Sequence, residues 1–218
     1  MHTLSKPGDR RRMRGEESRK LILQAAVACI ATQGLSNTTL DRVAAGAGVS
    51  RALVVFHFKS KHGLLAEVLG MLGARYSEGW DAAIAAGGIS TIERLLRLLD
   101  YDVRFASEHP EFLSAWHAFW GEGKGNSLYR ELSVPRDERY ARDTRRLLAV
   151  LIEEGGYDHN DLIPIHTVLT AVLFGLWVEY HLNPGPDDYR KGMAAVRLFL
   201  SKVFPKHPLP PANATAAI

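Results

Sequence analysis

The spacing of apolar residues along the chain predicts an all-α protein of about nine helices. In residues 16–33, Ile22, Ala26 and Ile30 recur at one-turn intervals and form one face, and Gly34 follows as a stop signal. No segment shows the strict apolar–polar alternation that is typical of half-buried strands. The pattern therefore indicates helical packing without a sheet.

The other expected helices are separated by glycine, proline or capping residues. They cover residues 39–47, 51–57, 60–86, 91–109, 110–122, 135–154, 162–182 and 187–204. The first two of these are short and are joined by a turn at Gly48, whereas most of the later ones are long enough to build a sizeable core. Residues 1–15 and 206–218 lack periodicity, so we expect disordered tails there.

Charge is distributed unevenly between the two parts of the chain. Residues 1–61 contain 11 Lys and Arg against 4 Asp and Glu, a net +7, and the remainder contains 16 against 20, a net −4. A basic N-terminal part on an acidic body favours a polyanionic partner for the N-terminal part. A solvated basic tail is the alternative, because four of the arginines lie within residues 10–14.

Cysteine usage and hydropathy favour a cytoplasmic protein. Cys29 is the single cysteine, so no intrachain disulfide forms, and its place on an apolar helix face indicates core packing. The longest apolar run, residues 162–178, has 17 residues and contains Pro164 and His166. At this length a buried helix is favoured over a membrane span, and residues 1–15 lack the apolar stretch of a secretory signal.

Residues 39–61 have the pattern of a helix-turn-helix. Gly48 permits a tight turn between two short helices, and Val49 is expected to fill the gap between them. Ser50 is placed to cap the second helix, and Arg51 lies in its first turn. In helix-turn-helix domains this end of the second helix enters the major groove. The pattern therefore indicates DNA binding.

The same segment resembles the N-terminal domain of the TetR family of bacterial repressors. The matching residues are Thr39, Val43, Ala44, Ala47-Gly48-Val49-Ser50, His57-Phe58 and Lys61. The resemblance implies a sequence-specific regulator that binds a near-palindromic DNA operator as a homodimer and is released by a ligand. It also implies a helix-turn-helix DNA-binding domain at residues 16–60 and a ligand-binding and dimerisation domain at residues 61–205.

The resemblance assigns roles to individual residues of the motif. The candidate DNA-binding residues are Thr39, Arg42, Ser50, Arg51, Ala52, Leu53, Val55, His57 and Lys61. Among them, Arg51, Ala52 and Leu53 would face the bases. Thr39, Ser50, His57 and Lys61 would lie at the DNA backbone. Many family members have a tyrosine at the position of Val55 and a glycine at that of Ala52, so those two contacts depart from the family pattern.

Two aromatic segments of the body, residues 110–120 and 175–177, are similar to the BetI-like branch of the family, which contains choline-responsive repressors of betaine synthesis. This likeness implies a quaternary ammonium effector, which aromatic cages bind by cation–π attraction. The candidate ligand-binding residues are Trp116, Phe119, Trp120 and Trp177, with Glu122 or Glu179 as a counter-charge. The alternatives are that Trp116, Phe119 and Trp120 form core, since they share one helix face, and that the body binds another amphipathic molecule or none.

The expected helix at residues 162–182 is apolar on almost every side. Its apolar residues are Ile165, Leu169, Val172, Leu173 and Leu176 on one side, with Ala171, Phe174 and Val178 elsewhere. A helix that is apolar all round must be covered all round, and a small body does not do this alone. We therefore expect a homodimer through residues 162–182 and 187–204.

The sequence carries no recognisable catalytic arrangement. It contains no His-Glu-x-x-His motif, no glycine-rich phosphate loop and no nucleophile elbow, so we expect no enzyme, no cofactor and no metal. A non-specific architectural DNA-binding protein and a small-molecule-binding helical protein or enzyme are the alternatives. A strong preference for one operator over unrelated DNA would distinguish a specific regulator from the first alternative.

Overall fold

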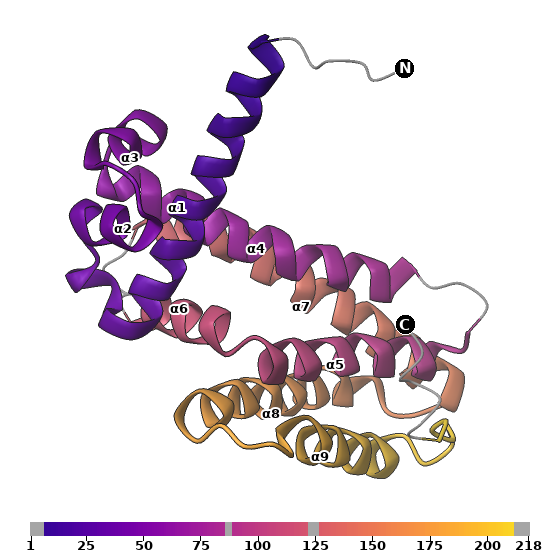
Figure 1. The fold of residues 1–218 in the computed structure, drawn as a ribbon. Helices are drawn as coiled ribbons and strands as arrows, with labels where there is room; N and C mark the ends of the chain where they lie inside the picture. Colours follow the sequence, from indigo (N-terminus) through magenta and orange to yellow (C-terminus); the bar gives the residue numbers. More distant parts are fainter. Residues whose placement is uncertain (1–6, 86–88, 122–126, 212–218) are drawn as a thin grey trace. The chain divides into compact units, whose positions relative to one another are not determined.

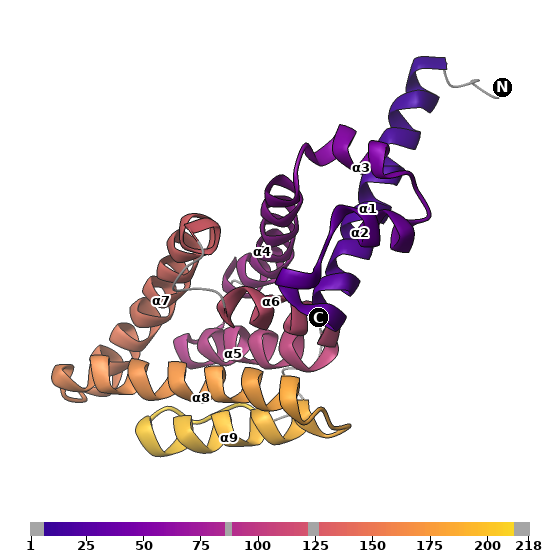
Figure 2. The same ribbon diagram turned by 90° about the vertical axis from the view of Figure 1, so that its left-hand side faces the viewer.

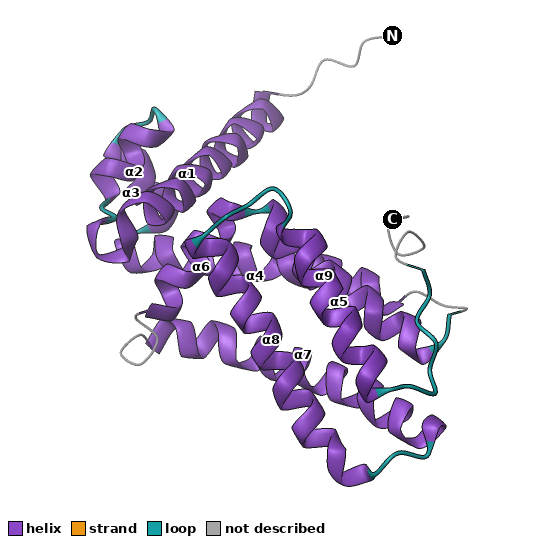
Figure 3. Ribbon diagram, turned by 90° about the horizontal axis from the view of Figure 1, so that it is seen from below, coloured by secondary structure: helices purple, strands orange, loops and turns teal. Residues whose placement is uncertain are grey.

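Nine α-helices and one 3₁₀-helix make up the part of the chain that the computed structural model describes, residues 7–85, 89–121 and 127–211, with side chains from Met13 onward (Figure 1). The α-helices are α1 Pro7–Asn37, α2 Leu40–Ala47, α3 Arg51–Phe58, α4 Lys61–Ala85, α5 Thr91–Glu108, α6 Pro110–Gly121, α7 Ser127–Gly155, α8 Leu162–Leu182 and α9 Asp188–Val203, with η1 at His159–Asp161. Within these ranges no residue is in a strand, so the all-α prediction is confirmed (Figure 3).

The chain divides into two compact units. The first comprises residues 1–72 and 114–132, and the second comprises residues 73–113 and 133–218. Helices α4, α6 and α7 each begin in one unit and end in the other. Residues 61–72 at the start of α4 therefore belong to the same unit as the first three helices. The functional division of the chain at residue 61 stays a prediction.

The first unit is built on the apolar face of α1. Helix α2 packs against this face and α3 packs against α2. The buried residues at these contacts are Ile22, Ala26, Ile30, Val43, Ala44, Val54 and Phe58. Burying each large aliphatic or aromatic side chain contributes about 1.5–3 kcal/mol, so the position of α3 is fixed by packing and not by its own short length.

The second unit has α5 as its central helix, with α8 and α9 packed beside it, as Figures 1 and 2 both show. Leu95, Leu99 and Val103 of α5 are almost completely buried. Gly192 of α9 allows the close approach, because a Cβ atom at this position would collide with the hydroxyl of Tyr180.

Most predicted helix ends agree with the structure. At Gly34 the backbone leaves helical geometry with a φ of 77°, as the predicted stop requires. The helices at 51–57, 162–182 and 187–204 are found within one residue of their expected bounds. The predicted breaks at residues 87–88 and 123–125, and the candidate counter-charge Glu122, lie outside the described residues.

Two helices begin earlier than predicted. Helix α1 begins at Pro7, so part of the segment expected to be disordered is helical. Proline is favoured in a first helical turn, and the absence of an apolar face there removed the periodic signal. Helix α7 begins at Ser127 and contains Pro135, which was expected to start it. Leu128 and Ser133 are buried before the proline, so packing supports the turn that Pro135 weakens.

The turn at Gly48 provides a test of the helix-turn-helix geometry. Gly48 has a left-handed backbone with φ 65° and ψ 32°, where an L side chain is strained. We expect Gly48→Ala to lower the free energy of unfolding by about 1 kcal/mol. Gly70→Ala is the matched control: its added Cβ meets nothing within 4 Å, so this helical substitution should be neutral or stabilising. Urea denaturation of both variants measures the difference, and equal effects would contradict the assigned role of the turn.

Candidate DNA interface and buried aromatic site

Side-chain caps fix the ends of the two motif helices. The Thr39 hydroxyl accepts a hydrogen bond from the Arg42 amide at 3.2 Å and caps α2, and the Ser50 hydroxyl accepts one from the Leu53 amide at 3.2 Å and caps α3. A cap of this kind contributes about 1 kcal/mol and satisfies an otherwise unpaired amide. Thr39 and Ser50 therefore hold the helix ends that are expected at the DNA backbone.

Helix α3 exposes both charged and apolar side chains. Arg51, Ala52 and Phe56 are exposed, and Val55 is half-buried. Leu53, which was expected to face bases, is half-buried as well. Val54 beside it is completely buried in the core of the unit.

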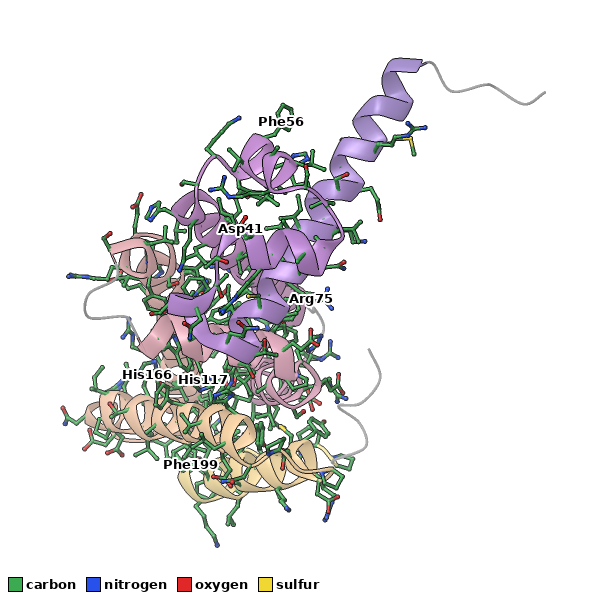
Figure 4. The ribbon with its side chains drawn as sticks, turned by 60° about the vertical axis from the view of Figure 1, so that its left-hand side comes forward. Asp41, Phe56, Arg75, His117, His166 and Phe199 are labelled. Carbon is green, nitrogen blue, oxygen red and sulfur yellow. The ribbon has the colours of Figure 1, made fainter. Side chains whose placement is uncertain are left out.

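Phe56 is an exposed residue of α3 that the sequence prediction missed. Its side chain is 68% exposed and projects outward at the end of the motif (Figure 4). The Lys59 ammonium lies 5.4 Å from the centre of its ring. Helical spacing in the sequence could have indicated its exposure, since Phe56 lies one turn after the predicted contact residue Ala52.

The charged groups of this face have partners within the unit. The Arg51 guanidinium lies 3.3 Å from the Asp41 carboxylate in an exposed ion pair. Arg42 donates a hydrogen bond to the Asn37 carbonyl at 2.7 Å. Because exposed pairs contribute less than about 1 kcal/mol, Arg51 can exchange Asp41 for a base edge at little cost.

Lys61 and His57, two of the predicted DNA-binding residues, both have atoms that are engaged or buried within the first unit. The Lys61 ammonium donates to the carbonyls of Leu35 and Ser36 at 2.7 and 3.1 Å, so it joins the start of α4 to the end of α1. Nε2 of His57 is buried. Burial and the nearby charges of Arg19 and Lys59 hold the pKa of His57 below its usual range, so this imidazole is neutral at physiological pH.

In the second unit, a buried carboxylate joins three helices. Asp102 of α5 accepts hydrogen bonds from the Tyr76 hydroxyl of α4 at 2.5 Å and from the Trp177 indole of α8 at 3.0 Å. Asp102 is only 6% exposed, and burial raises its pKa to about 6 although both hydrogen bonds favour the charged form. Burial, followed by the Asp102 charge, also raises the pKa of Tyr76.

Aromatic rings surround this carboxylate. The ring of Tyr76 is the centre of the group, with five other aromatic rings at centroid distances of 5.1 to 6.0 Å. These five belong to Trp80, Tyr101, Phe105, Tyr140 and Trp177. We call this set of six rings with Asp102 the aromatic site.

A second carboxylate lies beside the aromatic site. Asp143 of α7 accepts a hydrogen bond from the Trp80 indole at 3.2 Å, and the Trp80 and Tyr140 rings are 4.6 Å apart. The site thus combines indole and phenol faces with two carboxylates, which are the groups that attract organic cations.

The predicted ligand residues fall in different parts of the chain. Trp177 belongs to the aromatic site of the second unit, whereas Trp116, Phe119 and Trp120 of α6 belong to the first unit. Trp116 and Phe119 are buried, and Trp120 donates a hydrogen bond to the Tyr129 hydroxyl. Their role as ligand contacts stays a prediction.

Asp102, Tyr76, Trp80 and Tyr140 were not among the sequence-predicted site residues. The signal for Asp102 was present, because this acidic residue occupies a buried phase of the α5 helix between Leu99 and Phe105. An acidic residue in such a phase is a reason to look for a functional site.

Two family descriptions match most of the chain. Residues 22–68 match the bacterial regulatory proteins of the tetR family, and residues 91–205 match the C-terminal domain of BetI-type transcriptional repressors. The chain belongs to the TetR family of transcriptional regulators. It is a helix-turn-helix regulator with a BetI-like repressor body.

Individual relatives agree with this assignment. The HTH-type transcriptional regulator BetI of Rhizobium meliloti is 30% identical over 176 residues, which cover 81% of this chain and 84% of that protein. The BetI regulator of Vibrio campbellii is 24% identical, over 83% of this chain and 89% of that protein.

Solved structures show the same fold. A proposed transcriptional regulator from Pseudomonas aeruginosa PAO1 has a TM-score of 0.75 at 26% identity and covers 87% of this chain and 91% of its own. A regulator from Saccharomonospora viridis, solved in complex with choline, has a TM-score of 0.74 at 22% identity and covers 85% of this chain and 96% of its own. The TetR fold predicted from residues 39–61 is therefore confirmed.

The raised pKa of Asp102 predicts an unusual pH dependence of stability in this TetR-family regulator. The folded-state pKa is about 6 against an ordinary value of 3.8, so the folded chain holds this proton more tightly than the unfolded chain. The stabilisation is complete below pH 3.8 and is lost as the pH rises through about 6, by about 3 kcal/mol. Relative to Asp102→Asn, the wild type should lose this free energy of unfolding between about pH 4 and pH 7.

Urea denaturation at fixed protein concentration measures this difference. Asp187→Asn serves as a control of opposite sign, because the hydrogen bond and charge of Arg190 lower the pKa of the exposed Asp187. Parallel stability curves for the wild type and Asp102→Asn would show that Asp102 does not titrate as stated.

Proposed function

We propose that this protein is a cytoplasmic repressor that binds a near-palindromic operator as a homodimer through α2 and α3 and is released by a small-molecule effector. The observation that carries the proposal is the capped, exposed N-terminal end of α3 with Arg51 in its first turn. An arginine at this position can donate two hydrogen bonds to a guanine edge in the major groove.

The proposed DNA contacts follow the exposed face of the motif. Arg51 and Ala52 read bases, Val55 and Phe56 add apolar contact with thymine methyl groups, and Thr39, Arg42 and Ser50 lie at phosphates. Lys61 stabilises the motif, because its ammonium donates hydrogen bonds that join the start of α4 to the end of α1. His57, with a lowered pKa, contributes as a neutral group.

Arg51→Ala tests the recognition helix. We expect operator affinity to fall by about 10- to 100-fold and base preference at one position to relax, because a bidentate contact contributes about 1–3 kcal/mol of discrimination. Arg190→Ala is the matched control, since it removes an exposed arginine from the second unit. Fluorescence anisotropy with operator and unrelated DNA measures both affinities. An Arg51→Ala protein that keeps the parent's affinity and preference would refute the assignment.

The proposed dimer interface is the outer face of α8 and α9. Large apolar side chains of these two helices are exposed to 45–66%: Ile163, Val168, Phe174, Leu182 and Leu198. Helix α8 is also long and apolar enough to cross a membrane. A second copy is the better cover, because α9 also exposes Leu198 on an otherwise charged, amphipathic helix.

Phe174→Asp tests this interface. A charge buried there without a partner should cost several kcal/mol, so we expect a monomeric mass at micromolar concentration where the wild type is dimeric. Leu21→Asp, a change at an exposed apolar residue of α1, should leave the dimer intact. Light scattering gives both masses. A monomeric wild type would contradict the proposal, as would a Phe174→Asp protein that remains dimeric.

The proposed effector is a quaternary ammonium compound or a similar amphipathic molecule. Support comes from the BetI-type C-terminal domain at residues 91–205 and from a structural neighbour that holds choline. An effector releases DNA only to the extent that it binds the DNA-free conformation more tightly. Trp177 of the predicted set lies in the aromatic site, and Trp116, Phe119 and Trp120 are the further candidates.

A further inference from the structure

The first half of α1 extends past the packed core of the first unit. The buried face of α1 begins at Ile22, and no residue from Met13 to Leu21 is buried. The helix itself begins at Pro7, so residues 7–21 precede this face, a length of about 22 Å at the helical rise of about 1.5 Å per residue. Figures 1 and 2 both show this segment projecting past α2 and α3. We call residues 7–21 the N-terminal arm.

The tip of the N-terminal arm is strongly basic. Residues 7–15 contain four arginines against one aspartate, which is a net charge of +3. The arginines are Arg10, Arg11, Arg12 and Arg14. Four like charges within five positions repel one another, and a row of phosphates relieves this repulsion by neutralising them. The composition of the tip is therefore suited to a polyanion.

Packing within the first unit does not explain why this segment is helical. Met13 and Leu21 are the only large apolar residues of the N-terminal arm, and both are exposed. A helical segment of this length without an apolar face is marginal by itself in water. Contacts between its charged side chains and a partner are therefore the interactions that can hold it in place.

The base of the N-terminal arm lies at the end of the recognition helix. Arg19 donates a hydrogen bond to the Glu67 carboxylate of α4 at 2.5 Å. Its guanidinium lies 5.6 Å from the ring centre of Phe58, the last residue of α3. After burial, the charge of Arg19 is the next cause of the lowered pKa of His57, a candidate residue at the DNA backbone. The arm is thus continuous with the surface proposed to bind DNA.

The spacing of charges along the arm places its tip beyond the end of α3. Arg10 and Arg14 precede Arg19 by nine and five residues, which corresponds to about 8–14 Å of helix. This distance equals the length of about two to four base pairs at about 3.4 Å per pair. Glu16 and Glu17 lie between the tip and the base, so the positive charge is concentrated at the tip.

DNA next to the operator is the polyanion that this position favours. A helix that lies on a membrane surface buries a continuous apolar face among the lipids, and the N-terminal arm has none. The tetR family description begins at residue 22, so the arm lies outside the motif that the family shares. Phosphate contacts need no particular base sequence, so they suit an element added to the motif that reads bases.

We infer that the N-terminal arm binds the phosphates of duplex DNA flanking the operator through the four arginines of its tip. The inference rests on the proposed function and adds a second contact that is independent of base sequence. The arm strengthens binding to DNA that continues past the operator, whereas α3 determines base preference. Each phosphate that it neutralises makes the affinity more dependent on salt, because condensed counterions are released.

Replacement of all four tip arginines by glutamine tests this inference in the full-length protein. Glutamine removes the charge and keeps a high helix propensity. The probes are two duplexes that carry an operator selected from random DNA with the wild type. One duplex ends at the operator, and the other continues for about one DNA turn on each side. We expect the flanks to strengthen wild-type binding by at least about tenfold at about 50 mM salt, and to leave binding by the variant unchanged.

Fluorescence anisotropy at several salt concentrations gives a second readout. On the long duplex, the slope of log affinity against log salt should be shallower by at least about 2 in the glutamine variant, which corresponds to one lost phosphate contact in each arm of a dimer. Replacement of the tip arginines by lysine keeps the charge, so the gain from the flanks should stay within about threefold of that of the wild type. Thermal unfolding confirms that each variant is folded.

The matched control removes four exposed arginines from the second unit, so its net charge equals that of the glutamine variant of the arm. The four control substitutions are Arg142→Gln, Arg145→Gln, Arg146→Gln and Arg190→Gln. The control should keep the gain from the flanks within about twofold of that of the wild type. An equal loss in the control would overturn the inference, because the effect would then belong to net charge and not to the arm.

Two other outcomes would also overturn the inference. One is an equal gain from the flanks in the wild type and the glutamine variant, and the other is an equal loss in the lysine and glutamine variants. If the tip arginines instead support binding to vesicles of phosphatidylserine and phosphatidylcholine, without any gain from DNA flanks, the arm belongs to a membrane surface.

The proposed function is tested separately on the short duplex. The wild type and the glutamine variant should both prefer the selected operator to unrelated DNA of the same length. A wild type without this preference would contradict the proposed function. The arm would then still be tested with unrelated duplexes of the two lengths, because its contacts do not depend on base sequence.

Discussion

The hydrogen bonds to Asp102 connect α4, α5 and α8, three helices of the second unit. The Asp102 carboxylate accepts one hydrogen bond from Tyr76 of α4 and one from Trp177 of α8. The positions of both helices relative to α5 are therefore linked to this buried group. Because the carboxylate is buried, each donor compensates part of its desolvation, and removal of either leaves an unpaired acceptor. The surrounding rings then pack where these bonds place them.

The DNA-binding motif depends on a different kind of constraint. Its two helices are only 8 residues each, too short to be stable alone, so capping and packing define them. Thr39 and Ser50 fix the N-terminal ends, Gly48 turns the chain, and Val54 and Phe58 fasten α3 to the core. The exposed residues of α3 are those that this packing leaves free to meet DNA.

The two parts of the protein use charge in opposite ways. In the first unit, Arg51 has an exposed and exchangeable partner, Asp41, so its charge remains available to a polyanion. In the second unit, Asp102 is enclosed by neutral donors and aromatic rings, so its carboxylate is balanced by hydrogen bonds and not by solvent. The two units therefore differ in whether their charged groups are exposed to solvent or enclosed by protein.

The sequence by itself determined the helical architecture, the bounds of α2, α3, α8 and α9 to within a residue or two, and the helix-turn-helix residues, because all of these depend on local spacing, caps and turns. It did not reveal the start of α1 or α7, where no periodic signal marks the boundary. Asp102, Tyr76, Trp80 and Tyr140 lie on three helices, and only Asp102 carries a local signal, as an acidic residue in a buried phase of α5. Nothing local distinguishes the other three from core residues. Only the packing of α4, α5, α7 and α8 brings them together, since a charge balance between distant segments is a property of tertiary structure.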